Sequence, residues 1–110
     1  MAYVTSAGLW RDWKQEHTHP GPVGTQPVGN TAVDLAYAMT QNPHMRVLVQ
    51  QGYYDLATPL GATRHFLQHI DLPETLRNNI TEAYYEAGHM MYLHPPSMAR
   101  FKDDLASFIR

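Results

Sequence analysis

The sequence predicts a mixed α/β fold in which parallel strands alternate with flanking helices. Two short apolar runs have the composition of buried strands, and apolar residues at helical spacing precede, separate and follow them. Strands joined through helices pair in a parallel sheet, because the connection must cross over the sheet to restore the strand direction. The predicted order is helix, strand, helix, strand, helix, with the sheet covered on both faces.

The first thirty residues are predicted to form an arm. Residues 2–17 favour a short strand or irregular arm leading to a turn of helix. Residues 17–29 (HTHPGPVGTQPVG) hold three prolines and three glycines, a composition that disfavours both helix and sheet and predicts an ordered loop or linker. The expected domain organisation is an N-terminal arm and Pro/Gly-rich loop over residues 1–30 and an αβαβα segment over residues 31–110.

The first helix and strand follow this arm. Asn30 or Thr31 can cap a helix that runs to about residue 41, before Asn42-Pro43 ends it. Its apolar stripe is formed by Ala32, Leu35, Ala36 and Met39. Residues 45–51 are the first predicted strand, because three consecutive apolar residues are typical of a strand buried on both faces.

The second half repeats the pattern. Pro59 opens a helix whose apolar face holds Leu60, Thr63, Phe66, Leu67 and Ile70. Pro73 opens a short helical piece, and residues 80–85 form the second predicted strand. Pro95-Pro96 starts a final helix with one apolar side, made of Met98, Phe101, Leu105, Phe108 and Ile109.

Composition narrows the function classes. The 110 residues carry a formal net charge of -2, so they lack the basic patch that nucleic acid or an anionic membrane surface would require, and neither is an expected partner. The absence of cysteine excludes a disulfide framework, a thiolate metal site and a cysteine nucleophile. No apolar run is long enough for a signal peptide or a membrane span, so the signal of an exported protein would lie upstream, and the compartment stays open.

Two candidate catalytic side chains follow the two predicted strands. Asp55 comes four residues after Gln51, and His89 comes four residues after Tyr85. Both therefore leave the sheet at the carboxyl ends of its strands, where reactive groups of parallel α/β sheets gather. A carboxylate that accepts a hydrogen bond from imidazole Nδ1 fixes the tautomer in which Nε2 can take a proton. The pair supplies two of the three members of a hydrolase triad.

Two segments, NPHMRVLVQQGYYDLATP and YYEAGHMMYLHPPS, resemble the last two catalytic segments of bacterial serine carboxypeptidase-like proteins, the peptidase S10 family. The resemblance covers roughly residues 31–110. It implies the C-terminal part of an α/β-hydrolase, with Asp55 as the triad acid and His89 as the base. It also implies a peptide substrate, a substrate pocket near Tyr54, Gly88 and Met90, and no cofactor. Esterase and acyltransferase activity stay open within the family.

The nucleophile of such a triad is missing from the chain. An α/β-hydrolase serine lies in a Gly-x-Ser-x-Gly turn before the acid and the base, and the serines here are Ser6, Ser97 and Ser107, none in such a turn. We therefore expect the nucleophile in an upstream segment, and a partner that is either this segment or a second copy of the chain. Alone, the chain is expected to be inactive. The alternative is a non-catalytic fragment or association module on the same scaffold.

Simpler interpretations accompany each candidate residue. Asp55 also fits a turn residue that precedes a helix, and His89 a solvated loop histidine. His65 and His69 have the i, i+4 spacing of metal ligands, and His17-x-His19 is a second pair. We predict no metal site, because position 66 is Phe where a zinc protease motif requires Glu, and exposed histidines are common on helices.

Overall fold

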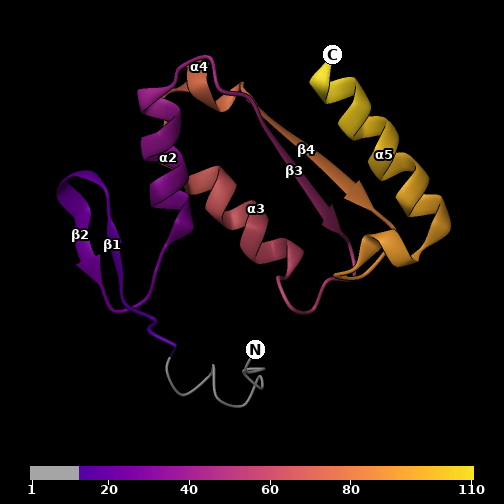
Figure 1. Cartoon of the computed structure of the whole chain (residues 1–110), viewed down its shortest axis with the longest axis horizontal. Helices are drawn as coiled ribbons and strands as arrows, with labels where there is room; N and C mark the ends of the chain where they lie inside the picture. The colour runs from indigo at the N-terminus through magenta and orange to yellow at the C-terminus, as the bar shows by residue number, and fades with distance from the viewer. Residues whose placement is uncertain (1–12) are drawn as a thin grey trace, which may run out of the picture.

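The computed structural model of the chain describes residues 13–110. Most of the arm predicted over residues 2–17 lies outside this part. The described residues form a mixed α/β structure with one antiparallel and one parallel pair of strands (Figure 1). The elements, in chain order, are β1 (His17–His19), the 3-10 turn η1 (Gly21–Val23), β2 (Gly24–Gln26), α2 (Thr31–Gln41), β3 (Val47–Gly52), α3 (Leu60–His69), α4 (Glu74–Arg77), β4 (Ile80–Tyr85), the 3-10 turn η2 (Met91–Leu93) and α5 (Pro95–Ile109).

The Pro/Gly-rich segment is a β-hairpin, which corrects the prediction of a loop without sheet. Strands β1 and β2 pair antiparallel, with His17 opposite Gln26 and His19 opposite Gly24. Gly21 and Gly24 take φ values of 78° and 69°, a left-handed conformation that favours glycine. The prolines and glycines are therefore concentrated in and next to the turn, so three residues on each side of it can pair as strands. Composition averaged over the segment hid this arrangement.

Helix α2 agrees with its prediction in bounds and cap. The Asn30 side-chain oxygen accepts a hydrogen bond from the Ala32 backbone N–H at 3.1 Å, which satisfies one of the free donors of the first turn. The apolar stripe of the helix turns inward, and Met39 is fully buried. The small core consists of Ala36, Met39, Ile70 and Leu72, with partly buried Leu35, Met45, Val47, Leu76 and Ile80 packed against it.

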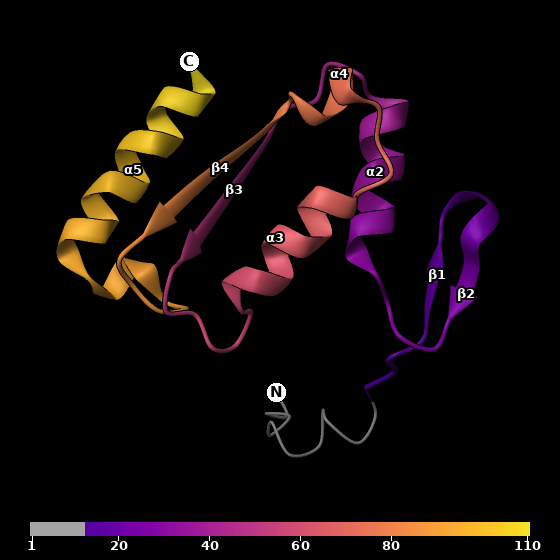
Figure 2. The same cartoon turned by 180° about the vertical axis from the view of Figure 1, so that it is seen from behind.

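Strands β3 and β4 pair in parallel, as the alternation of elements predicted. The register places Val47 opposite Ile80 at one end and Gly52 opposite Tyr85 at the other. Figures 1 and 2 show α5 beside this pair on one side and α3 on the other. The strand predicted to be buried on both faces is only half-buried at residues 47–50, because the sheet has two strands within the described residues.

Helix α5 packs against the sheet through both polar and apolar contacts. The fully buried Tyr85 donates its hydroxyl proton to Asp104 at 2.7 Å and accepts a hydrogen bond from the Gln50 amide at 2.9 Å. The apolar side predicted for this helix is only partly covered, since Phe101 and Phe108 are half-buried. The other three members, Met98, Leu105 and Ile109, are exposed.

No helix within residues 13–110 has both the length and the apolar character needed to cross a membrane.

Candidate active site

The ends of β3 and β4 bring Asp55 and His89 together. The two strands finish side by side, at Gly52 and Tyr85, and each side chain follows a few residues later. The His89 Nδ1 atom lies 2.9 Å from the Asp55 Oδ2 atom. This is hydrogen-bond distance for a charged acceptor, and it is the proximity that the sequence led us to expect.

The Asp55 carboxylate is buried and accepts a hydrogen bond from each of four donors. Its Oδ1 atom accepts from the backbone N–H groups of Ala57 and Thr58, both at 2.9 Å. Its Oδ2 atom accepts from the Thr58 hydroxyl at 2.7 Å and from His89. These bonds, led by the Thr58 N–H, hold the pKa of Asp55 well below its usual range even though desolvation acts in the opposite direction.

The ionisation of Asp55 fixes the tautomer of His89. An ionised carboxylate has no proton to donate, so the hydrogen bond between them requires the proton on His89 Nδ1. In the neutral ring, Nε2 then carries a free lone pair. The Asp55 side chain is 5% exposed and that of His89 is 60% exposed, so the pair has a buried acid and an accessible base. This is the form in which an imidazole can act as a general base.

The two loops that carry the pair are bonded to each other along their backbones. The Tyr53 N–H donates to the Tyr85 carbonyl at 2.8 Å, and the Tyr54 N–H donates to the Ala87 carbonyl at 3.0 Å. At Gly52 the second loop approaches so closely that a Cβ atom would overlap the carbonyl oxygens of Ala87 and Gly88. Glycine at position 52 is therefore a structural requirement of the site.

The three predicted pocket residues lie near the pair, but they do not enclose it. Tyr54 and Met90 are exposed, and Gly88 is half-buried in the backbone contact with Gly52. The same two loops expose further large apolar side chains, most of all Leu56, which is 92% exposed. We call this group the dyad surface; it consists of Tyr53, Tyr54, Leu56, Met90, Tyr92 and Leu93.

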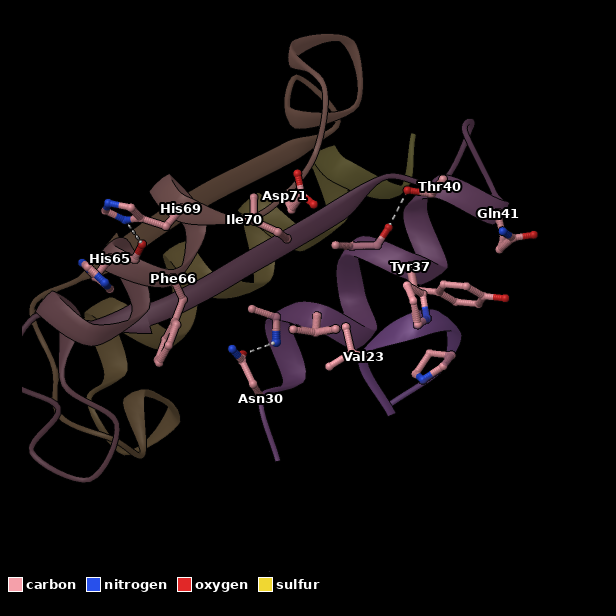
Figure 3. Close-up of a pocket in the computed structure, with 15 residues that line it drawn as sticks. Val23, Asn30, Tyr37, Thr40, Gln41, His65, Phe66, His69, Ile70 and Asp71 are labelled. Carbon is pink, nitrogen blue, oxygen red and sulfur yellow. Dashed lines mark hydrogen bonds between the residues drawn. The ribbon is translucent and has the colours of Figure 1, made fainter. Parts of the chain in front are cut away.

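A pocket of about 530 Å³ lies elsewhere, between the hairpin, α2 and α3 (Figure 3). Tyr37, Phe66 and Ile70 contribute to its walls, and Asp55 and His89 do not. The histidine pair of α3 also lines it, with the two rings 4.1 Å apart. The His69 ring bonds through Nδ1 to the His65 carbonyl oxygen, which orients it on its own helix.

The described serines do not complete the triad. Ser97 is buried in the first turn of α5, and its hydroxyl is hydrogen-bonded to His94 Nδ1 at 2.7 Å. Ser107 is exposed near the other end of the same helix. Ser6 lies outside the described residues.

Sequence reasoning missed two residues that shape the site. Thr58 supplies two of the four hydrogen bonds to Asp55, and Gly52 permits the close approach of the two loops. The first had a signal in the sequence, because Asp followed three residues later by Thr is a pattern of side-chain-to-backbone turns. The second had none, since a glycine that ends a strand gives no indication of which backbone approaches it.

Comparison with known proteins gives no family assignment: no family model, no curated protein and no solved structure matches this chain.

Proposed function

We propose that Asp55 and His89 are the acid and the base of a serine hydrolase triad, in a protein similar to serine carboxypeptidases with the α/β-hydrolase fold. The observation that carries the proposal is the 2.9 Å contact between a buried, ionised carboxylate and the Nδ1 atom of an accessible imidazole. Asp55 orients the ring and stabilises the imidazolium, and Nε2 takes the proton of the nucleophile.

The nucleophile in this proposal is a serine of another segment, because the sequence has no Gly-x-Ser-x-Gly turn. That segment covers the dyad surface and brings its hydroxyl to His89 Nε2. Six large apolar side chains exposed on the two loops that carry the pair support a covered surface, since exposed apolar groups gathered in one region mark interaction sites. Peptides with a free carboxyl end are the proposed substrates, on the basis of the resemblance.

The tautomer of His89 tests the acid–base part of the proposal on the isolated chain. Imidazole ¹⁵N shifts of the neutral ring in the wild type should show the proton on Nδ1 and a free lone pair on Nε2. In Asp55→Asn, the amide that replaces the carboxylate can donate to Nδ1, so the proton should move to Nε2. His94→Ala is the matched control, because this second loop histidine does not contact Asp55. A neutral wild-type ring with its single proton on Nε2 would rule out the proposed role of the pair.

Hydrolytic activity tests the part of the proposal that places the nucleophile in another segment. The isolated chain should not hydrolyse carboxyl-terminal peptides or activated esters above a denatured control, because the base has no nucleophile to activate. When combined with the nucleophile-bearing segment, it should hydrolyse them, and Asp55→Asn should lower kcat by about 10⁴-fold through the wrong tautomer. A His89-dependent rate in the isolated chain would instead indicate a water-activating mechanism.

The alternative is a non-catalytic association module, and the half-buried edge strand β3 is the observation that favours it. Unpaired strand edges and exposed apolar residues promote association of chains. In this case the isolated chain forms a homo-oligomer whose population rises with concentration, and no serine-bearing segment restores hydrolysis. Light scattering coupled to size-exclusion chromatography, repeated with that segment present, separates the two functions.

A further inference from the structure

A second carboxylate in contact with histidine, here with two imidazoles, lies far from β3 and β4 in the fold, where the hairpin meets α2 (Figure 1). Asp34, in the first turn of α2, accepts from His17 Nε2 at 2.7 Å through Oδ2 and from His19 Nδ1 at 2.9 Å through Oδ1. The three residues each offer a ligand atom within 4.8 Å of the others. Within residues 13–110, this is the only such group of three or more metal-binding side chains.

The donor set suits one class of ion. Two imidazole nitrogens and one carboxylate oxygen are ligands of Zn²⁺ and of similar divalent transition metals, whereas Mg²⁺ and Ca²⁺ take oxygen ligands. In a tetrahedral site with bonds of about 2.0 Å, neighbouring ligand atoms lie about 3.3 Å apart. The two hydrogen-bonded nitrogen–oxygen pairs, at 2.7 and 2.9 Å, lie closer than this, and all three ligand atoms lie within 4.8 Å of one another, so modest rotations of the rings and the carboxylate bring them to the spacing of a metal site.

We propose that His17, His19 and Asp34 bind a divalent transition-metal ion of the zinc class and so join the hairpin to helix α2. Three protein ligands leave the fourth position of a tetrahedral site for water. The proposal is independent of the proposed hydrolase function.

The positions of the ligands support this assignment. The His19 side chain is fully buried, so its ring is already held in place next to the carboxylate. The His17 and Asp34 side chains are 44% and 30% exposed, which gives an ion access from solvent. The Asp34 carboxylate accepts a hydrogen bond from each ring, so its two oxygens already face the two nitrogens.

Binding requires two proton shifts, and one of them provides a specific reporter. The metal replaces the proton on His17 Nε2, and this proton moves to Nδ1 of a ring that is partly in solvent. It also replaces the proton on His19 Nδ1, which moves to Nε2. That nitrogen accepts a long hydrogen bond of 3.3 Å from the Asn30 backbone N–H, so metal binding must break it. The Asn30 amide resonance should therefore respond to the metal directly.

The experiment is a titration of the 110-residue chain with Zn²⁺ by calorimetry and with Co²⁺ by visible absorption at neutral pH. The starting protein is the His65→Ala/His69→Ala variant, which lacks the competing helical histidine pair. We expect binding of one ion per chain, a shift of the Asn30 amide and a rise in Tm. His17→Ala and Asp34→Asn should each lower the metal affinity at least tenfold. Loss of a residue that only orients a metal ligand already lowers affinity by this amount, and loss of the ligand itself should lower it no less.

Three outcomes would overturn the assignment. One is the absence of saturable one-to-one binding in the starting protein. Another is undiminished affinity in His17→Ala or Asp34→Asn, each verified as folded by circular dichroism. The third is binding of the same affinity that leaves the Asn30 amide unchanged. His89→Ala serves as the matched histidine control and should bind as the starting protein does.

Discussion

Replacement of Gly52 by alanine should destabilise the fold and separate the two loops of the candidate active site. A Cβ atom at position 52 would lie 2.8 Å from the Ala87 carbonyl carbon and would overlap the carbonyl oxygens of Ala87 and Gly88. All these atoms belong to the backbone, so no side chain can rotate out of the way. The second loop must move away, and the Tyr54–Ala87 hydrogen bond of 3.0 Å is the first contact affected.

The magnitude follows from two terms. Overpacking of a closely packed site costs about 1–3 kcal/mol. Loss of a backbone hydrogen bond at the same place adds about 0.5–1.5 kcal/mol. The free energy of unfolding should therefore fall by about 1.5–4.5 kcal/mol. For a domain of this size, each kcal/mol lowers Tm by about 4–8 °C.

Thermal and urea denaturation of Gly52→Ala measure this loss, and Gly61→Ala is the matched control. Gly61 lies in helix α3, and a Cβ atom there would meet nothing within 4 Å. Because alanine is the better helix former, the control should gain up to about 1 kcal/mol. If Gly52→Ala is as stable as the wild type, the two loops do not approach each other as described. The geometry of the Asp55–His89 pair, which these loops carry, would then be wrong as well.

Three further changes test other parts of the structure. Because the pKa of Asp55 is lowered in the folded state, its ionised carboxylate stabilises the fold fully above the unfolded carboxyl pKa of about 3.9. This stabilisation is lost as the pH falls through the folded pKa. In urea denaturation, the stability advantage of the wild type over Asp55→Asn should therefore shrink in acid. Tyr85→Phe leaves Gln50 and Asp104 without their shared partner and should cost about 1–3 kcal/mol by the same measurement; no loss would show that α5 does not depend on this network. Asn30→Ala removes the cap of α2 and should lower the free energy of unfolding by about 1 kcal/mol, whereas an unchanged value would indicate that the cap is replaced by water.

The parts of the fold that the sequence predicted correctly depend on local physics. The cap at Asn30 and the prolines that open α3 and α5 act within one helical turn, so their effect can be read from neighbouring residues. The parallel pairing also followed, because a helical connection between strands leaves few other topologies. The half-buried state of β3 could not be predicted in this way, since burial depends on how many strands lie beside it.

The two carboxylate–histidine clusters show where prediction from sequence stops. Asp55 was paired with His89 because parallel strands finish at one edge of a sheet, and each residue follows its strand by a few positions. Asp34 was missed as the partner of His19, because their contact depends on a hairpin that composition had excluded and on the angle at which it meets α2. A pairing set by strand register can be predicted, whereas one set by tertiary packing needs coordinates.

The two interpretations of Asp55 also turn out to be compatible. As a turn residue, it uses Oδ1 to accept from the backbone N–H groups of Ala57 and Thr58. As a candidate triad acid, it uses Oδ2 to accept from the His89 ring. The turn bonds lower the pKa of the carboxylate and fix its direction before the imidazole contributes. A carboxylate held in this way remains ionised and in place when His89 gains or loses a proton, which is the property that a triad acid requires.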